Sequence, residues 1–319
     1  MNSIKVSVNI PIYNASRYLR KCLDSMQNQT IREIEFVLVD DGSTDNSLQI
    51  CNEYAKNDSR FKVFHKENGG SASARQLALD NSLGEYVIVC DADDWAEPDM
   101  YERLYETAKS SGVDISTCDY YVNYEDGTQI ESTHRITSCS NEQLIRDAIT
   151  HSIPPSSWIK LISKKFIVEN QINYEEGINL GEDFLFFVKV VLCKPKIKKI
   201  DLPLYHYRRA MNSGSYTNNP QYSSFLQMES VYKWISQNVN ESKFGREIFN
   251  LANDVGFLGL RVPDMDVSYH KRFLRTCLPF SNYFKYHKFT FKYIIVFLSK
   301  FNRYICVRLY GLLKGYFYK

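Results

Sequence analysis

Acidic residues gather in two short segments of the first hundred residues. One segment reads Asp-Asp-Gly-Ser-Thr-Asp over 40–45, and the other reads Asp-Ala-Asp-Asp over 91–94. Each follows a short apolar run that is typical of a buried β-strand. Neighbouring carboxylates raise each other's pKa unless a cation neutralises them. A hard divalent ion such as Mg²⁺ or Mn²⁺, which binds oxygen ligands and bridges carboxylates to substrate phosphates, is their natural partner.

The elements that must position these carboxylates alternate between strand and helix over residues 1–120. Apolar residues at helical spacing, as over 19–26, predict helices between the strands. Pro98 suits the first residue of the helix that carries Met100 and Leu104. This alternation predicts βαβ units, and hence an α/β fold with a mainly parallel sheet flanked by helices. Ligands of such sheets bind beyond the carboxyl ends of the strands, so we expect both acidic segments to meet at one edge. The predicted strands cover 5–10, 34–39, 61–64 and 85–90.

The composition is that of a globular protein. The chain has 319 residues, of which 44 % are hydrophobic and 24 % charged, which excludes a disordered or disulfide-dense chain. None of the eight cysteines has the CxxC spacing of a zinc or thioredoxin-type site. Apolar runs fall short of the roughly 20 residues of a spanning helix, and we see no signal peptide. We therefore expect a cytoplasmic protein with reduced thiols.

Charge is distributed unevenly along the chain. Residues 267–319 hold 11 Lys and Arg and no Asp or Glu, which leaves 28 basic against 37 acidic residues before them. A helical pattern over 222–262 is followed, from about 283, by a basic aromatic tail that predicts an amphipathic helix. One arc of that helix would carry Lys292, Ser299, Lys300, Arg303 and Lys314.

Three partners suit this tail. Docking on the inner face of the cell membrane suits its basic and aromatic residues best, and packing against the body or a partner subunit is the second interpretation. Nucleic acid is the third, but the acidic body and the lack of a nucleic-acid motif argue against it. We expect no nucleic-acid partner, and a homo-oligomer stays open.

Four segments, in this order and spacing, resemble family 2 glycosyltransferases. They are 8–14, 39–45, 68–75 and 84–94, and weaker similarity continues through 158–161, 181–184 and 204–209. The resemblance implies a GT-A fold, a nucleotide-sugar donor and an inverting mechanism. It also implies a transferase domain over 1–216, with a nucleotide-sugar half at about 1–120 and an acceptor half at about 121–216. Residues 217–319 would then form a helical C-terminal extension.

The resemblance assigns donor-binding roles at the ends of the first strands. Pro11 and Tyr13 would flank the base and ribose, and Asp41 would hydrogen-bond the nucleobase, most often uracil. Asp91 and Asp93 match the DxD motif, with Asp93 near the ribose and the metal.

Metal ligands stay open between neighbouring residues. Asp94 matches a position that ligates Mn²⁺ or Mg²⁺ in some relatives, so both Asp93 and Asp94 are candidates. His206 is a further candidate ligand, although a lone His between tyrosines is more often packed or solvated.

Basic residues elsewhere could contact the diphosphate. Arg208 and Arg209, followed by a hydroxyl-rich segment at 212–215, suit bidentate phosphate binding, and a solvated surface loop is the alternative. Arg75 is equally suited to a phosphate contact and to structural pairing. Trp158 could stack on a sugar ring and Lys160 could touch a hydroxyl or phosphate, although a core Trp and a surface Lys fit equally well.

Asp183 is the candidate general base. It follows Gly181 and Glu182 where an apolar helix begins. An acid at a helix N-terminus also stabilises the helix dipole, a role that Glu182 could serve instead. A base here would take the acceptor proton as its oxygen attacks the anomeric carbon, a displacement that inverts configuration.

These features predict a metal-dependent, inverting hexosyl- or N-acetylhexosaminyltransferase. We expect a UDP-sugar donor and a glycan or polyprenyl-diphosphate-linked acceptor, in capsule, O-antigen or exopolysaccharide assembly. A catalytically inactive transferase that serves as a binding or scaffold subunit is the first alternative. A sugar nucleotidyltransferase is the second, but it needs a glycine-rich basic loop after the first strand, and residues 11–15 are not one.

Overall fold

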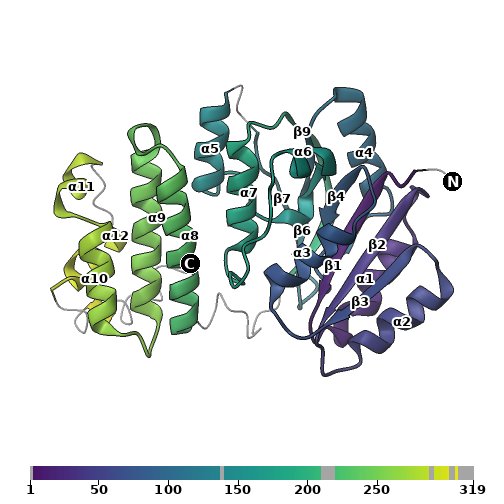
Figure 1. The fold of residues 1–319 in the computed structure, drawn as a ribbon, viewed down its shortest axis with the longest axis horizontal. Coiled ribbons are helices and arrows are strands. Elements are labelled where there is room, and N and C mark those ends of the chain that lie inside the picture. Colours follow the sequence, from purple (N-terminus) through teal and green to yellow (C-terminus); the bar gives the residue numbers. More distant parts are fainter. Residues whose placement is uncertain (1–2, 137–139, 210–219, 287–290, 302–305, 308–319) are drawn as a thin grey trace. The chain divides into compact units, whose positions relative to one another are not determined.

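The computed structural model describes residues 3–136, 140–209, 220–286, 291–301 and 306–307. Its chain divides into two compact units, residues 1–212 and 213–319. The first unit holds the sheet and its flanking helices, and the second is helical (Figure 1).

Strands and helices alternate over residues 6–89 of the first unit, as the sequence predicted. Its strands are β1 (Val6–Ile12), β2 (Ile34–Asp41), β3 (Phe61–Lys66), β4 (Tyr86–Val89), β5 (Trp95–Ala96), β6 (Ile115–Tyr124), β7 (Gln129–Ser132), β8 (Lys160–Ser163) and β9 (Ile197–Arg209). Its helices are α1 (Ser16–Gln27), α2 (Ser47–Asn57), α3 (Ser71–Asn81), α4 (Met100–Ser111), α5 (Asn141–Ile149), the 3₁₀ helix η1 (Ser157–Ile159), α6 (Lys164–Glu169) and α7 (Glu182–Leu192).

One sheet runs through this unit in the order β3-β2-β1-β4-β8-β6-β9-β5, and β7 pairs with β6. Strands β3, β2, β1 and β4 are parallel, which confirms the parallel sheet expected from the first 120 residues. Beyond β4 the sheet is mixed, because β8 runs antiparallel to both of its neighbours. Since β2 and β4 flank β1 in parallel, their carboxyl ends lie at one edge of the sheet.

The core lies on both faces of this sheet. Alternate residues of β2 point to opposite faces, so Phe36 and Leu38 join a large cluster with α1, α2 and α4. Val37 and Val39 join a smaller cluster with Ala74 and Ala78 of α3. Burial of each such aliphatic side chain contributes about 1.5–3 kcal/mol, and this packing fixes the strand ends that carry the acidic segments.

Two local predictions were wrong. Pro98 was expected as the first residue of a helix, but α4 begins at Met100, and the Pro98 carbonyl instead accepts a hydrogen bond from Thr30. The second strand was expected to end before Asp40, but β2 continues to Asp41. It does so because β3 offers a partner for each carboxylate: His65 Nδ1 lies 2.7 Å from Asp40 Oδ2, and Lys66 Nζ lies 2.6 Å from Asp41 Oδ1.

The second unit is a set of helices: α8 (Tyr222–Asn238), α9 (Glu241–Arg261), α10 (Val267–Cys277), α11 (Phe280–Lys285) and α12 (Phe291–Ser299). The helical pattern expected over 222–262 is two helices, because Asn240 interrupts it and caps α9 through the Ser242 N–H. Within the described ranges, no helix is long and apolar enough to cross a membrane.

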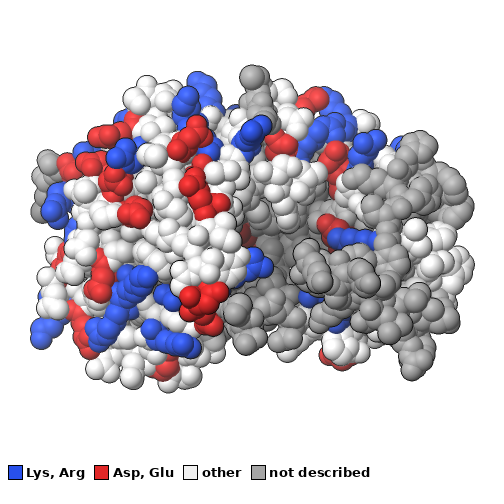
Figure 2. Space-filling view, turned by 180° about the vertical axis from the view of Figure 1, so that it is seen from behind, with Lys and Arg blue, Asp and Glu red and all other residues white. Residues whose placement is uncertain are grey.

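The basic face expected of the tail is wrong at two positions. Ser299 is fully buried, and Lys300 is 8 % exposed because its ammonium group donates to the Leu278 carbonyl. Arg303 and Lys314 lie outside the described residues. On the face of the molecule in Figure 2, the described acidic and basic side chains are interspersed rather than separated.

Candidate active site

Strand β9 organises the carboxylates that follow β4. The Tyr205 hydroxyl accepts from the Asp91 N–H at 3.1 Å and donates to Asp94 Oδ2 at 2.8 Å. The Arg208 N–H donates to Asp94 Oδ1 at 2.7 Å, so both oxygens of this buried carboxylate accept hydrogen bonds. Asp93 is exposed, and its carbonyl accepts from Arg208 Nε at 2.9 Å.

The carboxyl groups of Asp93 and Asp94 have raised pKa values. Although the Asp93 side chain reaches solvent, surrounding protein atoms partly desolvate its carboxylate, and this desolvation, followed by the charge of Asp91, raises the pKa of Asp93 to about 6. Burial and the charges of Asp93 and Asp91 raise the pKa of Asp94 well above its ordinary value. A bound cation would lower both, because it favours the charged form.

The donor set fits a cation shared with a substrate. The Asp93 carboxylate forms no ion pair with any described side chain, and it is open to solvent. Within the described residues, no three His, Cys, Asp or Glu side chains are grouped to hold a metal by themselves. Mg²⁺ typically binds one or two carboxylates and takes its other ligands from phosphates and water, so Asp93 beside Asp94 suits this mode.

Asp41 holds the turn that begins α3. Its Oδ1 accepts from Lys66 Nζ at 2.6 Å and from the Gly69 N–H at 2.9 Å, and its Oδ2 accepts from the Gly70 N–H at 2.8 Å. Gly70 has a φ of 87°, and a Cβ there would lie 2.2 Å from Asn179 Nδ2. The turn therefore requires glycine at position 70, and the buried Asp41 carboxylate fixes it.

Pro11 and Tyr13 lie at the carboxyl end of β1. Pro11 is half-buried beside β2, and the Tyr13 side chain is 54 % exposed. Because β1 lies between β2 and β4, the structure brings these two residues to the same edge as Asp41 and Asp91.

Arg75 connects this edge to Asp183. Its buried guanidinium donates from Nη2 to Asp91 Oδ1 at 2.9 Å. Its Nη1 contacts the Asp183 carboxylate and lies 3.9 Å from Glu182 Oε1. Of the two alternatives for Arg75, the structure shows the pairing with carboxylates, which joins the segment after β4 to the N-terminus of α7.

Asp183 lies in the first turn of α7, whose N-cap is Gly181 with a φ of 83°. The Ser157 hydroxyl donates to Asp183 Oδ1 at 2.9 Å, and the Ser157 N–H donates to Oδ2 at 3.4 Å. Glu182 instead accepts from the Ser71 hydroxyl at 2.8 Å. Both acids thus lie near Arg75, and Asp183 is the one that Ser157 also holds.

Trp158 and Lys160 are buried. Trp158 is 6 % exposed, and its ring stacks on Tyr205 and Tyr207 with centroids 4.5 and 5.6 Å away. Lys160 is 1 % exposed, so the surface alternative for this residue is wrong. It is buried because β8 is an interior strand between β4 and β6, and its ammonium group donates to the carbonyls of Pro154 and Ser156.

His206 is surrounded by protein partners. Its Nε2 lies 2.8 Å from Glu97 Oε1, and its Nδ1 lies 3.3 Å from Asn123 Nδ2. The ring also stacks between Trp95 and Tyr121, at centroid distances of 4.8 and 4.9 Å. Since both ring nitrogens have neighbours, this arrangement gives no support to His206 as a metal ligand.

The two arginines at the end of β9 diverge, because successive residues of a strand point to opposite faces. The Arg208 guanidinium lies over the rings of Tyr18 and Trp95, at 4.7 and 5.3 Å from their centroids. The Arg209 guanidinium lies 5.9 Å from the centroid of Tyr124. The hydroxyl-rich segment at 212–215 lies outside the described residues.

Several residues that build this site were not predicted from the sequence. Tyr205 bridges Asp91 and Asp94, Lys66 pairs with Asp41, and Ser157 holds Asp183. The sequence offers one relevant pattern, since strand alternation places Tyr205 and Tyr207 on one face of β9. The partnerships of Lys66 and Ser157 depend on strand pairing and on a turn, which no local pattern specifies.

Comparison with known proteins identifies the family. Residues 7–191 match the family model described as Glycosyl transferase family 2. The chain belongs to this family. It is 34 % identical over 218 residues to the glycosyltransferase EpsH of Bacillus subtilis, covering 67 % of this chain and 63 % of EpsH. It is 33 % identical over 184 residues to the chondroitin synthase of Pasteurella multocida, covering 56 % of this chain and 19 % of the synthase.

Solved structures show the same fold. S. aureus TarS matches with a TM-score of 0.71 at 20 % identity, over 96 % of this chain and 55 % of TarS. A TarS fragment in complex with UDP-GlcNAc matches with a TM-score of 0.63 at 19 % identity, over 99 % of this chain and 93 % of the fragment. The fold is thus the GT-A α/β fold with a helical C-terminal part, as expected. The chain spans less than two thirds of the length of EpsH and of the chondroitin synthase.

Proposed function

We propose that this protein is an inverting glycosyltransferase that moves a sugar from a nucleotide-sugar donor to a hydroxyl group of an acceptor. One observation carries the proposal: Arg75 lies between Asp91 and Asp183 and contacts both. A donor bound at Asp91 would thus present its sugar close to the carboxylate of Asp183. Membership of glycosyl transferase family 2 supports this reading.

The donor would bind along the edge formed by β1, β2 and β4. Pro11 and Tyr13 would flank the base and ribose, and Asp41, through the turn that it fixes, would shape the base site. Arg208 and Arg209 would supply cationic contacts to the diphosphate. Arg75 would hold Asp91 in place rather than bind phosphate, and Trp158 would support the site from the core.

A divalent cation fits beside Asp93, with Asp94 as the second candidate ligand. When bound, Mn²⁺ or Mg²⁺ would neutralise charge that develops on the diphosphate leaving group. The chain's own contribution is to keep Asp93 accessible while Tyr205 and the Arg208 N–H hold Asp94.

Asp183 would act as general base. Its carboxylate would accept the proton of the acceptor hydroxyl as that oxygen forms a bond to the anomeric carbon. The bond from the anomeric carbon to the diphosphate oxygen breaks in the same step, and the electron pair leaves with the nucleoside diphosphate. A single displacement of this kind inverts the configuration at the anomeric carbon.

The comparisons support a UDP-sugar donor and a role in polysaccharide synthesis. The TarS fragment was solved with UDP-GlcNAc, and one relative is a chondroitin synthase. We propose a hexosyl or N-acetylhexosaminyl donor and a glycan or polyprenyl-diphosphate-linked acceptor, in capsule, O-antigen or exopolysaccharide assembly. In this proposal residues 1–216 form the transferase domain and 217–319 the helical extension.

The helical extension would dock on the inner face of the cell membrane. Ile294, Leu298 and Phe301 are 40, 43 and 72 % exposed. Ile294 and Leu298, four residues apart, lie on one face of α12, and Phe301 follows just after this helix. The absence of acidic residues over 267–319 would add attraction to anionic lipid. The protein would then act in the cytoplasm as a peripheral membrane enzyme.

Donor turnover tests the proposed function. Purified protein with Mn²⁺, a UDP-sugar and a lipid-linked acceptor should release UDP, and proton NMR of the product should show an inverted anomeric carbon. Loss of a general base costs about 10²–10⁴-fold in rate, so Asp183→Asn should lose turnover while it retains UDP binding. Glu182→Gln is the matched control and should retain most of the turnover. A wild-type protein that binds UDP but turns over none of a panel of UDP-sugars would favour the inactive scaffold.

A further inference from the structure

Lys160 holds the turn at residues 154–156 from the inside of the protein. Its ammonium group donates to the Pro154 carbonyl and, at 2.7 Å, to the Ser156 carbonyl. The same group lies 4.4 Å from the centroid of the Phe187 ring, on α7. A buried ammonium group is costly unless it is hydrogen-bonded, so these contacts fix both the turn and the side chain.

Ser157, the first residue of η1, directly follows residues 154–156 and holds Asp183. The Tyr174 hydroxyl donates to Ser157 Oγ at 3.4 Å, and Ser157 Oγ donates to Asp183 Oδ1 at 2.9 Å. The Ser157 N–H donates to Oδ2 of the same carboxylate at 3.4 Å. Lys160 therefore touches the turn that carries Ser157 and the helix that carries Asp183.

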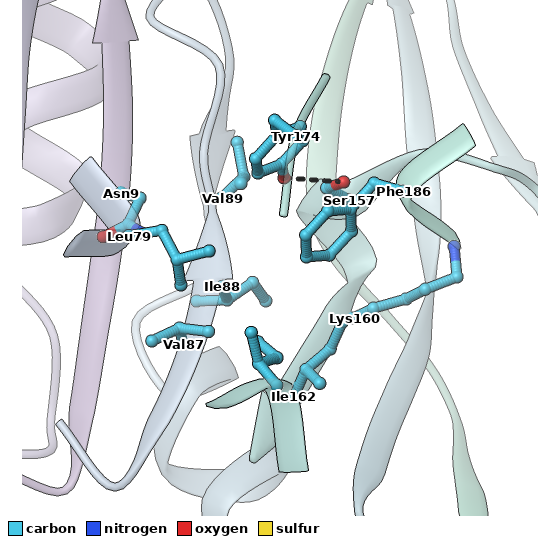
Figure 3. Close-up of a pocket in the computed structure, with 11 residues that line it drawn as sticks. Asn9, Leu79, Val87, Ile88, Val89, Ser157, Lys160, Ile162, Tyr174 and Phe186 are labelled. Atoms are coloured by element: carbon cyan, nitrogen blue, oxygen red, sulfur yellow. Dashed lines mark hydrogen bonds between the residues drawn. The ribbon is translucent and has the colours of Figure 1, made fainter. Parts of the chain in front are cut away.

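A small cavity lies beside Ser157. It has a volume of about 20 Å³, and Ser157, Tyr174, Lys160, Val87, Val89 and Phe186 are among its lining residues (Figure 3). This space is enough for about one water molecule. Few atoms pack against Ser157 on the side of this cavity. Its position therefore depends mainly on its hydrogen bonds and on residues 154–156, which precede it.

We propose that Lys160 is a positioning residue, which orients the Asp183 carboxylate through the turn at 154–156 and through Ser157. The inference rests on the proposed role of Asp183 as general base. The sequence suggested that Lys160 contacts a substrate hydroxyl or phosphate. A positioning role suits the structure better, because the side chain is buried and its ammonium group donates to backbone carbonyls.

The pKa of the Asp183 carboxyl group measures this orientation directly. Protein labelled with ¹³C at aspartate carboxyl groups can be titrated by NMR, and Asp183→Asn assigns the resonance. Ser157→Ala removes a hydrogen bond to the charged form, which should raise the pKa of Asp183 by about one unit. Lys160→Met should raise it in the same direction.

The double variant Ser157→Ala/Lys160→Met should raise the pKa no further than Ser157→Ala alone, because both changes act through one contact. Lys164→Met is the matched control: Lys164 also donates to a backbone carbonyl, that of Ser82, but this contact leads away from Asp183. A lysine that acted only through its charge would also raise this pKa, but its effect would add to that of Ser157→Ala, so an additive double variant would contradict the inference. A folded Lys160→Met protein with the wild-type Asp183 pKa would also overturn the inference.

Two further measurements keep the test decisive. If Lys160→Met does not fold, Lys160→Gln retains a donor of reduced reach and should give a smaller shift; no shift would count against the proposal. In turnover of UDP-GlcNAc, Lys160→Met should lower kcat roughly 10- to 100-fold with little change in KM, as expected of a misplaced base. If the wild type turns over no donor, the proposed function fails, while the NMR titration still decides the role of Lys160.

Discussion

The stability of this protein should depend on pH through Lys160. Burial lowers the pKa of this lysine from 10.5 to about 7 in the folded protein, an effect that the nearby Cys118 opposes only in part. Between pH 7 and 10.5 the unfolded chain therefore binds more protons at this site than the folded chain. The free energy of unfolding rises with pH across this window, and the full cost of burying the charge is present below pH 7.

The lowered pKa of Lys160 sets how much the free energy of unfolding changes with pH. A difference of three to four pKa units corresponds to about 5 kcal/mol at 1.36 kcal/mol per unit. Roughly 3 kcal/mol of this penalty disappears between pH 6 and pH 9, so the free energy of unfolding rises by that amount. Lys160→Met lacks this titration, so the free energy of unfolding of the wild type should rise by about 3 kcal/mol relative to this variant over the same interval.

Urea denaturation followed by tryptophan fluorescence at pH 6, 7, 8 and 9 provides the measurement. Trp95 and Trp158 both lie in the unit that contains Lys160. Lys165→Met is the matched control, because the Lys165 side chain is 79 % exposed, and its difference from the wild type should stay flat with pH. An equally flat difference for Lys160→Met would refute the reasoning, since it would mean that Lys160 keeps an ordinary pKa when folded.

Three other predictions follow from the site and the helical unit. Partial burial would raise the pKa of Asp45, but hydrogen bonds from Ser16 and Ser47 outweigh it and lower this pKa to about 2. Asp45→Ala should therefore remove a stabilisation of less than about 1 kcal/mol, because the group is exposed. In acid denaturation, this difference from the wild type should fade as the pH falls from 4 to 2. Asp41→Asn should lower the free energy of unfolding by about 1–3 kcal/mol, because a partly buried N–H of the glycine turn loses its acceptor, and it should weaken UDP binding in calorimetry. A triple variant, Ile294→Ser/Leu298→Ser/Phe301→Ser, changes the exposed apolar side chains on α12 and just after it, and it should sediment less than the wild type with anionic phosphatidylglycerol vesicles. Val168→Ser, which changes an exposed side chain of the first unit, is the control and should bind as the wild type does. Undiminished binding by the triple variant would exclude this face as the membrane contact.

The parallel half of the sheet was predictable because its sequence pattern is local. Apolar runs mark buried strands, and helical spacing marks the helices between them. Because parallel strands share an edge, the same pattern also predicted that the two acidic segments meet. The mixed half beyond β4 was not predicted, since the pairing of β8 with β4 and β6 depends on contacts between distant residues.

The acidic residues of the site were predictable, and their partners were not. Asp93 and Asp183 stand out because carboxylates follow apolar strands or begin an apolar helix. Lys160 shows the limit of this reasoning, because the local sequence around a lysine in a short strand does not show whether the side chain faces water or the core. Only the position of β8 inside the sheet shows that Lys160 is buried.

We expect the carboxylates at the end of β4 to bind a nucleoside diphosphate together with a cation. Calorimetric titration with UDP, GDP, CDP and dTDP, with and without Mn²⁺, tests it most directly, and Asp93→Ala serves as the site variant because Asp93 is exposed and forms no ion pair with a described side chain. We predict UDP binding that requires both Mn²⁺ and Asp93. Binding of none of the four nucleotides, or UDP binding that neither Mn²⁺ nor Asp93→Ala alters, would contradict the account.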